Sequence, residues 1–226
     1  MNADVPGSGA VAARVDWGVP ARYLALPHAP RGMTVGLFGG SFNPPHAGHA
    51  LVAETAIRRL RLDQLWCIVS PGNPLKDHSE LLPLAQRIRR CEAILRHPKI
   101  RVTAFEASHS VRYTADTLEL VRARNPGVRF VWIMGADNLA GFHRWQRWPQ
   151  IARSVPIAVI DRPGSTLAYL SSRMAQTFAH ARHDEEDAPR LAGMRPPAWT
   201  FIHGPRSSLS STDLRRADAP GEIRAR

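Results

Sequence analysis

The chain of 226 residues is 44% hydrophobic and 22% charged, close to the usage of soluble globular proteins, and it is long enough to bury a core as a single domain. None of its apolar runs approaches the roughly 20 residues of a membrane-spanning helix, which excludes that class of membrane protein. The net charge of +11 is carried almost entirely by arginine, which suits phosphate ligands, but the scarcity of lysine indicates biased codon usage and gives the charge little weight.

Residues 1–32 lack the basic stretch and apolar core of a secretory signal, and their alanine, proline and glycine content predicts a flexible extension. Cys67 and Cys91 form neither a Cys-x-x-Cys pair nor a disulfide framework, and Cys67 is expected in the core. We therefore expect a cytoplasmic protein with one folded domain at 33–216 and a C-terminal tail at 217–226.

Short apolar runs alternate with longer segments of helical period along the chain. They predict strands at 34–38, 65–69, 100–105, 129–134, 155–160 and 199–202, and helices at 47–60, 84–96, 114–124, 148–154 and 167–181. Such alternation favours an α/β fold with a doubly wound parallel sheet and helices on both faces, in which ligands bind beyond the carboxyl ends of the strands. The acidic run at 184–187 is expected to be a solvated loop.

The stretch GLFGGSFNPPHAGH, residues 36–49, follows the first strand and leads into the first long helix. Its glycines let backbone approach a ligand, and the helix that begins near Ala47 directs its amide groups and positive dipole end toward the same turn. His46 and His49 can point to one side and donate to phosphate oxygens. We therefore favour a phosphate clamp over two alternatives, a zinc site, which needs further ligands, and histidines that merely pack or face solvent.

A second anion site is predicted in SSTDLRR, residues 210–216. Serine and threonine are favoured at helix N-caps, and Arg215 lies one helical turn beyond Ser211. An ordinary capped surface helix is an equally open alternative for this stretch taken alone. Paired with the first motif, it could grip a triphosphate from the other end.

Three further segments narrow the choice of ligand. SPGNPLKDH at 70–78 is a loop that carries Lys76, RYTADTLE at 112–119 places Thr114 at a helix N-cap, and MGADNLAGFHRWQRW at 134–148 carries Asp137 and two tryptophans. A tryptophan face can stack on a flat heteroaromatic ring, more strongly if that ring is a cation such as a pyridinium. Trp148 is expected in the core, whereas the polar neighbours of Trp145 indicate partial exposure.

These motifs carry a resemblance to a known family. GGSFNPPHAGH resembles the G-G-T/S-F-D/N-P-x-H-x-G-H signature of the nucleotidyltransferases, whose fold is Rossmann-like, and SSTDLRR resembles their C-terminal S-S/T-x-x-R motif. With the Y-T-x-D-T-L and G-x-D-N-L-x-x-F-x-x-W patterns in this order, residues 34–216 resemble the bacterial nicotinate-nucleotide adenylyltransferases. The resemblance implies transfer of the adenylyl group of ATP to nicotinate mononucleotide, giving nicotinate adenine dinucleotide and pyrophosphate in NAD biosynthesis.

The resemblance also implies roles for individual residues. His46, His49 and Arg215 would be catalytic, and the ATP site would comprise Gly39, Gly40, Ser41, Phe42, His46, Gly48, His49, Gly135, Asp137, Ser211, Thr212 and Arg215. The acceptor would be held by Asn73, Lys76, Thr114, Trp145 and Arg162. Mg²⁺ would be bound through the ATP phosphates, with no protein ligands named. The implied partners are ATP and nicotinate mononucleotide, without nucleic acid or membrane, and a homo-oligomer is possible.

The match loosens at two places. Residues 74–76 read Pro-Leu-Lys where relatives often carry Pro-His-Lys, and Asn43 replaces the frequent aspartate of the first motif. The alternatives are an adenylyltransferase for another acceptor, such as nicotinamide mononucleotide or phosphopantetheine, and a non-catalytic nucleotide- or RNA-binding protein. No RNA-binding signature supports the second alternative.

Overall fold

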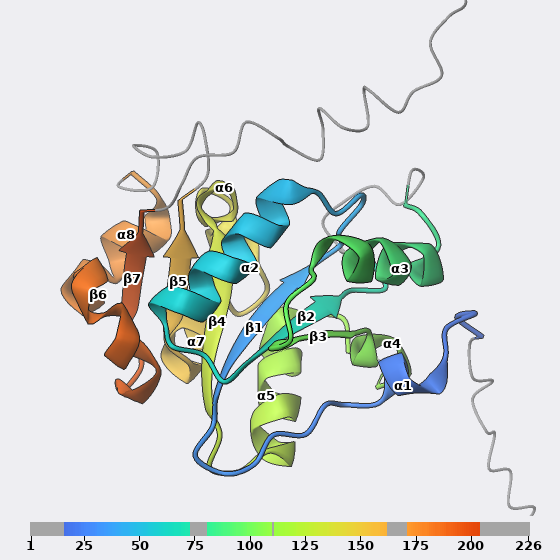
Figure 1. The fold of residues 1–226 in the computed structure, drawn as a ribbon. Coiled ribbons are helices and arrows are strands. Elements are labelled where there is room, and N and C mark those ends of the chain that lie inside the picture. Colours follow the sequence, from blue (N-terminus) through green and yellow to red (C-terminus); the bar gives the residue numbers. More distant parts are fainter. Residues whose placement is uncertain (1–15, 73–80, 110, 162–170, 204–226) are drawn as a thin grey trace, which may run out of the picture.

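A seven-stranded parallel sheet forms the centre of the protein. The structure is a computed structural model that describes residues 16–72, 81–109, 111–161 and 171–203. The strands lie in the order β3-β2-β1-β4-β5-β7-β6 (Figure 1). Their bounds are β1 (Thr34–Gly40), β2 (Gln64–Val69), β3 (Ile100–Thr103), β4 (Arg129–Gly135), β5 (Ile157–Ile160), β6 (Arg182–His183) and β7 (Trp199–Ile202). The parallel sheet of an α/β fold is thus confirmed.

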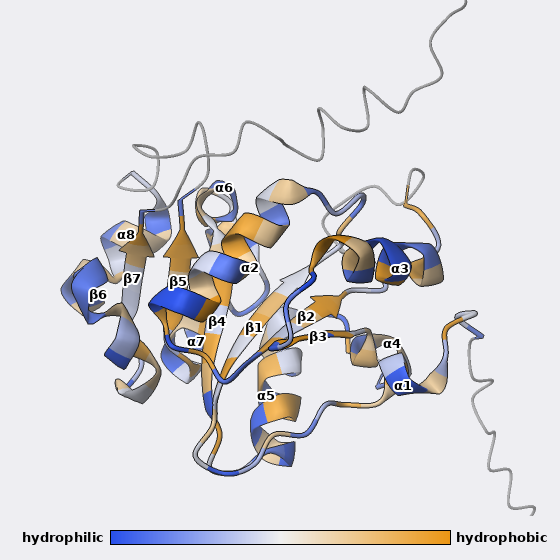
Figure 2. Cartoon of the chain, viewed as in Figure 1, coloured by the Kyte–Doolittle hydropathy of each residue, from blue (hydrophilic) through white to orange (hydrophobic). Residues whose placement is uncertain are grey.

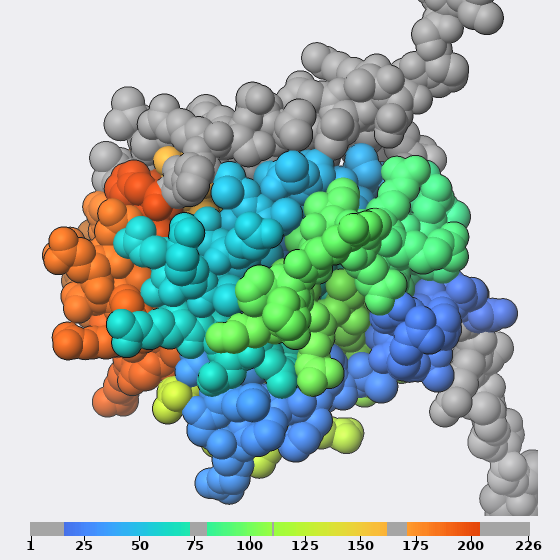
Figure 3. Space-filling view, in the orientation of Figure 1, coloured from blue at the N-terminus to red at the C-terminus, as the bar shows by residue number. Residues whose placement is uncertain are grey.

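Helices cover both faces of the sheet, because its side chains alternate between two apolar layers. α2 (Ala47–Arg59) and α3 (Leu84–Ile94) pack on the layer that contains Phe38, whereas α5 (Thr114–Arg124) and α7 (Trp148–Ser154) pack on the layer that contains Leu37. β2, β4 and β5 are largely hydrophobic (Figure 2). In the space-filling view, α2 lies across the front, with α3 in green to its right and residues 171–203 in orange and red to its left (Figure 3).

Most predicted elements are confirmed to within two residues, and the exceptions have local causes. The strand predicted at 100–105 ends at Thr103, because the Thr103 hydroxyl accepts the amide of Phe105 (3.3 Å) and α4 (Phe105–Ser108) begins there. β5 begins at Ile157 rather than at residue 155, since Pro156 has no amide to donate to a ladder. The described part of the helix predicted at 167–181 is divided into α8 (Arg173–Thr177) and the 3₁₀ helix η2 (Ala179–Ala181).

Two segments are more ordered than the sequence predicts. The acidic run at 184–187 is not a simple solvated loop, since the 3₁₀ helix η3 (Glu185–Gly193) starts in it and Glu185 accepts the backbone amide of His203 (2.8 Å). Within the expected flexible extension, residues 16–32 contain α1 (Ala21–Leu24), whose Tyr23 is 7% exposed and accepts the Ala104 amide at its carbonyl (2.7 Å). Within the described ranges, no helix is both long and apolar enough to cross a bilayer.

A buried arginine ties together the loops that leave β1 and β2. Arg87 of α3 is 1% exposed and donates to four backbone carbonyls, those of Ser41 and Ser70 (2.7 Å each), Leu82 (2.8 Å) and Pro71 (3.2 Å). Burial lowers its pKa to about 10, so that the guanidinium is still charged at neutral pH. The planar fork of donors therefore fixes both loops at the carboxyl edge of the sheet.

A buried carboxyl group lies beneath the first turns of α5. Glu106 of α4 is 9% exposed, and its Oε1 accepts the hydroxyl of Thr117 (2.6 Å). Burial raises the pKa of Glu106 to about 7, although the hydrogen bond from Thr117 acts in the opposite direction. The carboxyl group is thus close to half protonated near neutral pH.

Replacing Arg87 with methionine is expected to lower the free energy of unfolding by about 3 kcal/mol or more, because buried carbonyls lose their donors. Arg87→Lys should recover part of this loss, since an ammonium carries three donors but lacks the planar fork. Urea unfolding followed by far-ultraviolet circular dichroism measures both. Arg89→Met, at an exposed position of α3, is the matched control. Equal stability of the Arg87→Met and Arg89→Met variants would contradict this role.

Glu106 also predicts a pH dependence of stability. Because its pKa is raised from 4.5 in the unfolded chain to about 7 in the folded protein, its contribution is fully present below about pH 4.5 and is lost as the pH rises through 7. Between about pH 5 and pH 8, the wild type should lose about 2.5 kcal/mol relative to Glu106→Gln. Parallel urea titrations of the two proteins measure this difference, and parallel pH profiles would refute it.

Candidate active site

The candidate site lies where the strand order reverses. From β1 the sheet extends through β2 and β3 on one side and through β4 and β5 on the other. β1 and β4 pair in parallel, with Phe38 opposite Ile133, so the loops that follow them leave the same edge side by side. The first loop leads through residues 41–46 into α2, and the second leads directly into α6 (Ala136–Leu139). Ligands of doubly wound folds bind at such a switch point.

The conformation of the turn between β1 and α2 is fixed by contacts of its own side chains and by Arg87. Phe42 has φ 47° and is 2% exposed, and its ring packs edge-on against Phe38 (5.4 Å between centroids) and beside His49 (5.0 Å). The Oδ1 of Asn43 accepts the backbone amide of Leu82 (3.1 Å). Together with the bond from Arg87 to the Ser41 carbonyl, these contacts define the path of the turn.

The two histidines cap α2 and lie against each other. His46 is the N-cap residue and is 2% exposed, and its Nδ1 accepts the amide of Gly48 (3.0 Å). The Nδ1 of His49 accepts the amide of His46 (3.2 Å), and the ring centroids are 4.0 Å apart. Because both Nδ1 atoms act as acceptors, each neutral ring carries its proton on Nε2. The capping geometry thus makes Nε2–H the donor of both imidazoles.

Several residues of the first motif are explained by packing and capping within the protein rather than by contact with a ligand. A Cβ on Gly39 would lie 2.6 Å from Cη2 of Trp132, so the strand needs glycine there to admit the indole ring. The amide of Gly48, which we expected to face an anion, is instead bound by the His46 ring. The ring of Phe42 has no polar group, so that only its backbone could donate to a ligand. The donors of this turn are therefore chiefly the imidazoles.

Trp145 and Thr114 lie on the opposite face of the sheet from α2. Trp145 follows the 3₁₀ helix η1 (Phe142–Arg144), is half-buried as expected, and packs edge-on against Phe142 (5.2 Å) and Trp132 (6.1 Å). Trp148 packs between Phe142 (6.0 Å) and Phe178 (5.8 Å), but it is half-buried at the edge of the core, like Trp145, rather than inside the core as predicted. Thr114 is the first residue of α5 and is half-buried.

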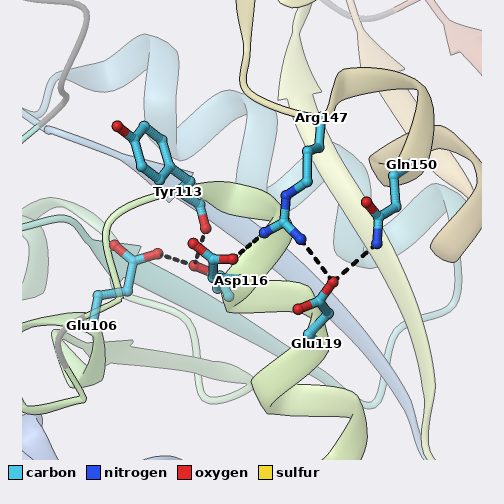
Figure 4. Close-up of polar contacts among 7 residues, drawn as sticks. Glu106, Tyr113, Asp116, Glu119, Arg147 and Gln150 are labelled. Atoms are coloured by element: carbon cyan, nitrogen blue, oxygen red, sulfur yellow. Dashed lines mark hydrogen bonds and ion pairs between the residues drawn. The ribbon is translucent and has the colours of Figure 1, made fainter.

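An ion-pair network connects the Trp145 segment to α5 (Figure 4). The guanidinium of Arg147 binds the carboxylates of Asp116 and Glu119, the latter at 3.0 Å, and Gln150 also donates to Glu119 (2.9 Å). The structure thereby brings the segments of Trp145 and Thr114 together. No sequence pattern singled out Arg147, whereas Arg87 could have been found from its position three residues after Leu84, on the buried face of α3.

The remaining predicted residues are only partly described. Gly135 ends β4 in a buried position, and Asp137 is exposed on the first turn of α6. The other six predicted site residues lie outside the described residues, namely Asn73, Lys76, Arg162, Ser211, Thr212 and Arg215. Within the described residues, no three His, Cys, Asp or Glu side chains gather where they could hold a metal ion.

The sequence matches one family model and many close relatives. The cytidylyltransferase-like model matches residues 37–217. A probable nicotinate-nucleotide adenylyltransferase of Mesorhizobium japonicum is 72% identical over 84% of this chain and 98% of its own length. Proteins described in the same words from Brucella abortus (72% identity, 81% of this chain, 95% of that protein) and Rhizobium johnstonii (63%, 86% and 98%) are similar as well.

Solved structures agree on the fold. The nicotinic acid mononucleotide adenylyltransferase of Plasmodium falciparum, complexed with NaAD, has a TM-score of 0.60 at 18% identity and covers 81% of this chain and 83% of its own. The same protein complexed with APC has a TM-score of 0.59 at 16% identity, with the same coverage. Given the family model and the high identity over most of its length, the chain belongs to the cytidylyltransferase-like nucleotidyltransferases and, among these, to the nicotinate-nucleotide adenylyltransferase family.

Proposed function

We propose that the protein transfers the adenylyl group of ATP to nicotinate mononucleotide, producing nicotinate adenine dinucleotide and pyrophosphate in the biosynthesis of NAD. The observation that carries this proposal is the pair of imidazoles at the start of α2, both set by their capping bonds to donate from Nε2 at the switch point of the sheet. Relatives that are 72% identical carry the name of the same activity.

In the proposed reaction, a phosphate oxygen of the mononucleotide attacks the α-phosphorus of ATP and forms the new P–O bond. The bond from that phosphorus to the oxygen that bridges it to the β-phosphorus breaks, and pyrophosphate leaves with the electron pair. No covalent intermediate with the protein is needed, so that the contribution of the chain is positioning and stabilisation of charge. His46 and His49 would donate their Nε2 protons in hydrogen bonds to phosphate oxygens, where negative charge develops.

ATP would enter as its magnesium complex, in which the metal would neutralise part of the phosphate charge. Mg²⁺ is commonly held through substrate phosphates and water, so no protein ligand is assigned to it. Ser211, Thr212 and Arg215 would hold the β- and γ-phosphates. Their role remains a prediction from the sequence.

The acceptor would bind on the α5 and α7 side of the sheet. The pyridinium ring of nicotinate mononucleotide is a flat cation, and the half-buried indole of Trp145 offers it an aromatic surface held by Phe142 and Trp132. Thr114, at the first turn of α5, would bind the same ring. Asn73, Lys76 and Arg162 would contact the rest of the acceptor, Arg162 at its phosphate.

Pyrophosphate release from ATP by the purified protein is expected to depend on nicotinate mononucleotide. We expect kcat/KM to be at least about tenfold lower with nicotinamide mononucleotide, because the acid and the amide differ in the hydrogen bonds they make, and lower still with phosphopantetheine. A coupled pyrophosphate assay measures all three, with ATP alone as the control. Tight RNA binding without stimulation by any acceptor would favour a binding protein instead.

The two imidazoles can be tested without disturbing the helix. His49→Asn and His46→Asn should each lower kcat by about a hundredfold, because each removes one donor positioned for the transition state. Asparagine is a favoured N-cap, so that His46→Asn should keep the start of α2, whereas His46→Ala should also lose about 1 kcal/mol of stability. Steady-state kinetics and thermal unfolding separate the two effects. His180→Asn, at an exposed position, is the control, and a folded His49→Asn variant with unchanged kcat would contradict the proposed role.

A further inference from the structure

The guanidinium of Arg147 joins the two elements that would hold the acceptor ring. Asp116 and Glu119 lie three residues apart on α5, so their carboxylates project from the same side of the helix. Arg147 reaches both with its two terminal nitrogens, and Gln150 adds a second bond to Glu119 (2.9 Å) (Figure 4). The Trp145 segment and the start of α7 are thereby held against the first turns of α5.

The backbone at Arg147 is unusual for its residue type. Arg147 has φ 54° and ψ 33°, in the left-handed region, which is unfavourable for a residue with a Cβ and is adopted more readily by glycine or asparagine. Its carbonyl accepts the amides of Gln150 (2.9 Å) and Ile151 (3.1 Å), so this conformation starts α7 at Trp148, three residues after Trp145. Glycine or asparagine would suit the backbone better, but neither could reach the two carboxylates.

Other contacts fix each element separately. Trp145 is set by its edge-on packing on Phe142 and Trp132. The first turns of α5 are held in position by the hydrogen bond that Thr117 donates to the buried Glu106 of α4 (2.6 Å). The bond from Arg147 to Asp116 connects these two units, and Asp116 is only two residues from Thr114. The distance between Trp145 and Thr114 therefore depends on Arg147, together with Gln150 and the packing of α5 and α7 in one apolar layer.

We propose that Arg147 is a positioning residue for the acceptor, which sets the Trp145 segment against the first turn of α5 so that one pyridine ring meets both Trp145 and Thr114. This inference rests on the proposed function. Arg147 acts on the face of the sheet that carries α5 and α7, whereas the imidazoles begin α2 on the other face, so that its effect falls on acceptor binding rather than on ATP binding.

Arg147→Asn is the informative variant, since asparagine tolerates the left-handed backbone but lacks the guanidinium. We expect KM for nicotinate mononucleotide to rise about tenfold, with kcat and KM for ATP within about twofold of the wild type. Arg122→Asn, at an exposed position in the last turn of α5, is the matched control and should leave all three parameters unchanged. An unchanged KM for the acceptor, or an equal rise in KM for ATP, would overturn the inference.

Two further variants distinguish positioning from charge and identify the residue through which Arg147 acts. If Arg147 only neutralised the carboxylates near an anionic acceptor, the triple variant Arg147→Asn/Asp116→Asn/Glu119→Gln would regain the wild-type KM, whereas positioning predicts that KM stays raised. In a Trp145→Ala background, Arg147→Asn should add less than about twofold to KM, because neighbours that act together are not additive. Full additivity there would overturn the inference. Absence of acceptor-dependent turnover in the wild type would instead overturn the proposed function, and the inference with it.

Discussion

The candidate site depends on a buried cation that has backbone carbonyls as its partners. Arg87 lies in the apolar layer beneath α3, where an arginine is tolerated only if its donors are satisfied. Its four acceptors come from the loop after β1 and from the segment between β2 and α3. The loops that follow parallel strands begin at the same edge of the sheet, but strand pairing does not fix their conformation. The hydrogen bonds from the Arg87 guanidinium fix it here.

In the proposed function, phosphate binding falls on one face of the sheet and binding of the acceptor ring on the other. On the α2 face, the capping bonds of His46 and His49 direct the Nε2 protons to act as donors, as phosphate oxygens require. On the α5 and α7 face, Trp132 and Phe142 support the indole of Trp145 through edge-on contacts, which leave its ring face to the acceptor in the proposed function. Gly39 connects the two faces, since its missing Cβ makes room for Trp132. This glycine of the first motif therefore also shapes the packing on the side proposed for the acceptor.

Sequence and structure agree best where the information is local. The strand at 34–38, the glycine turn and the helix from Ala47 follow each other in the chain, and their pattern predicted each of them. The predictions were less accurate where the contact of a single residue, rather than a periodic pattern, sets the end or the type of an element. Contacts of Thr103 and the missing amide of Pro156 move the ends of two strands from their predicted positions. In the acidic run, Glu185 binds Arg59 and His203, and a 3₁₀ helix starts there. Helices of four residues, such as α1, α4 and α6, are too short to produce a helical period.

By itself, the sequence determined the α/β class, the order of most elements and the motif that places two histidines at the start of a helix, because each of these is encoded in neighbouring residues. Only the tertiary structure decided which groups hold the site in shape. Arg87 meets a carbonyl 46 residues away, Arg147 a carboxylate 31 residues away, and Thr117 a buried carboxyl 11 residues away. No local pattern encodes these partners, because a long polar side chain can reach many acceptors, and the packed fold determines which of them lies within hydrogen-bonding distance.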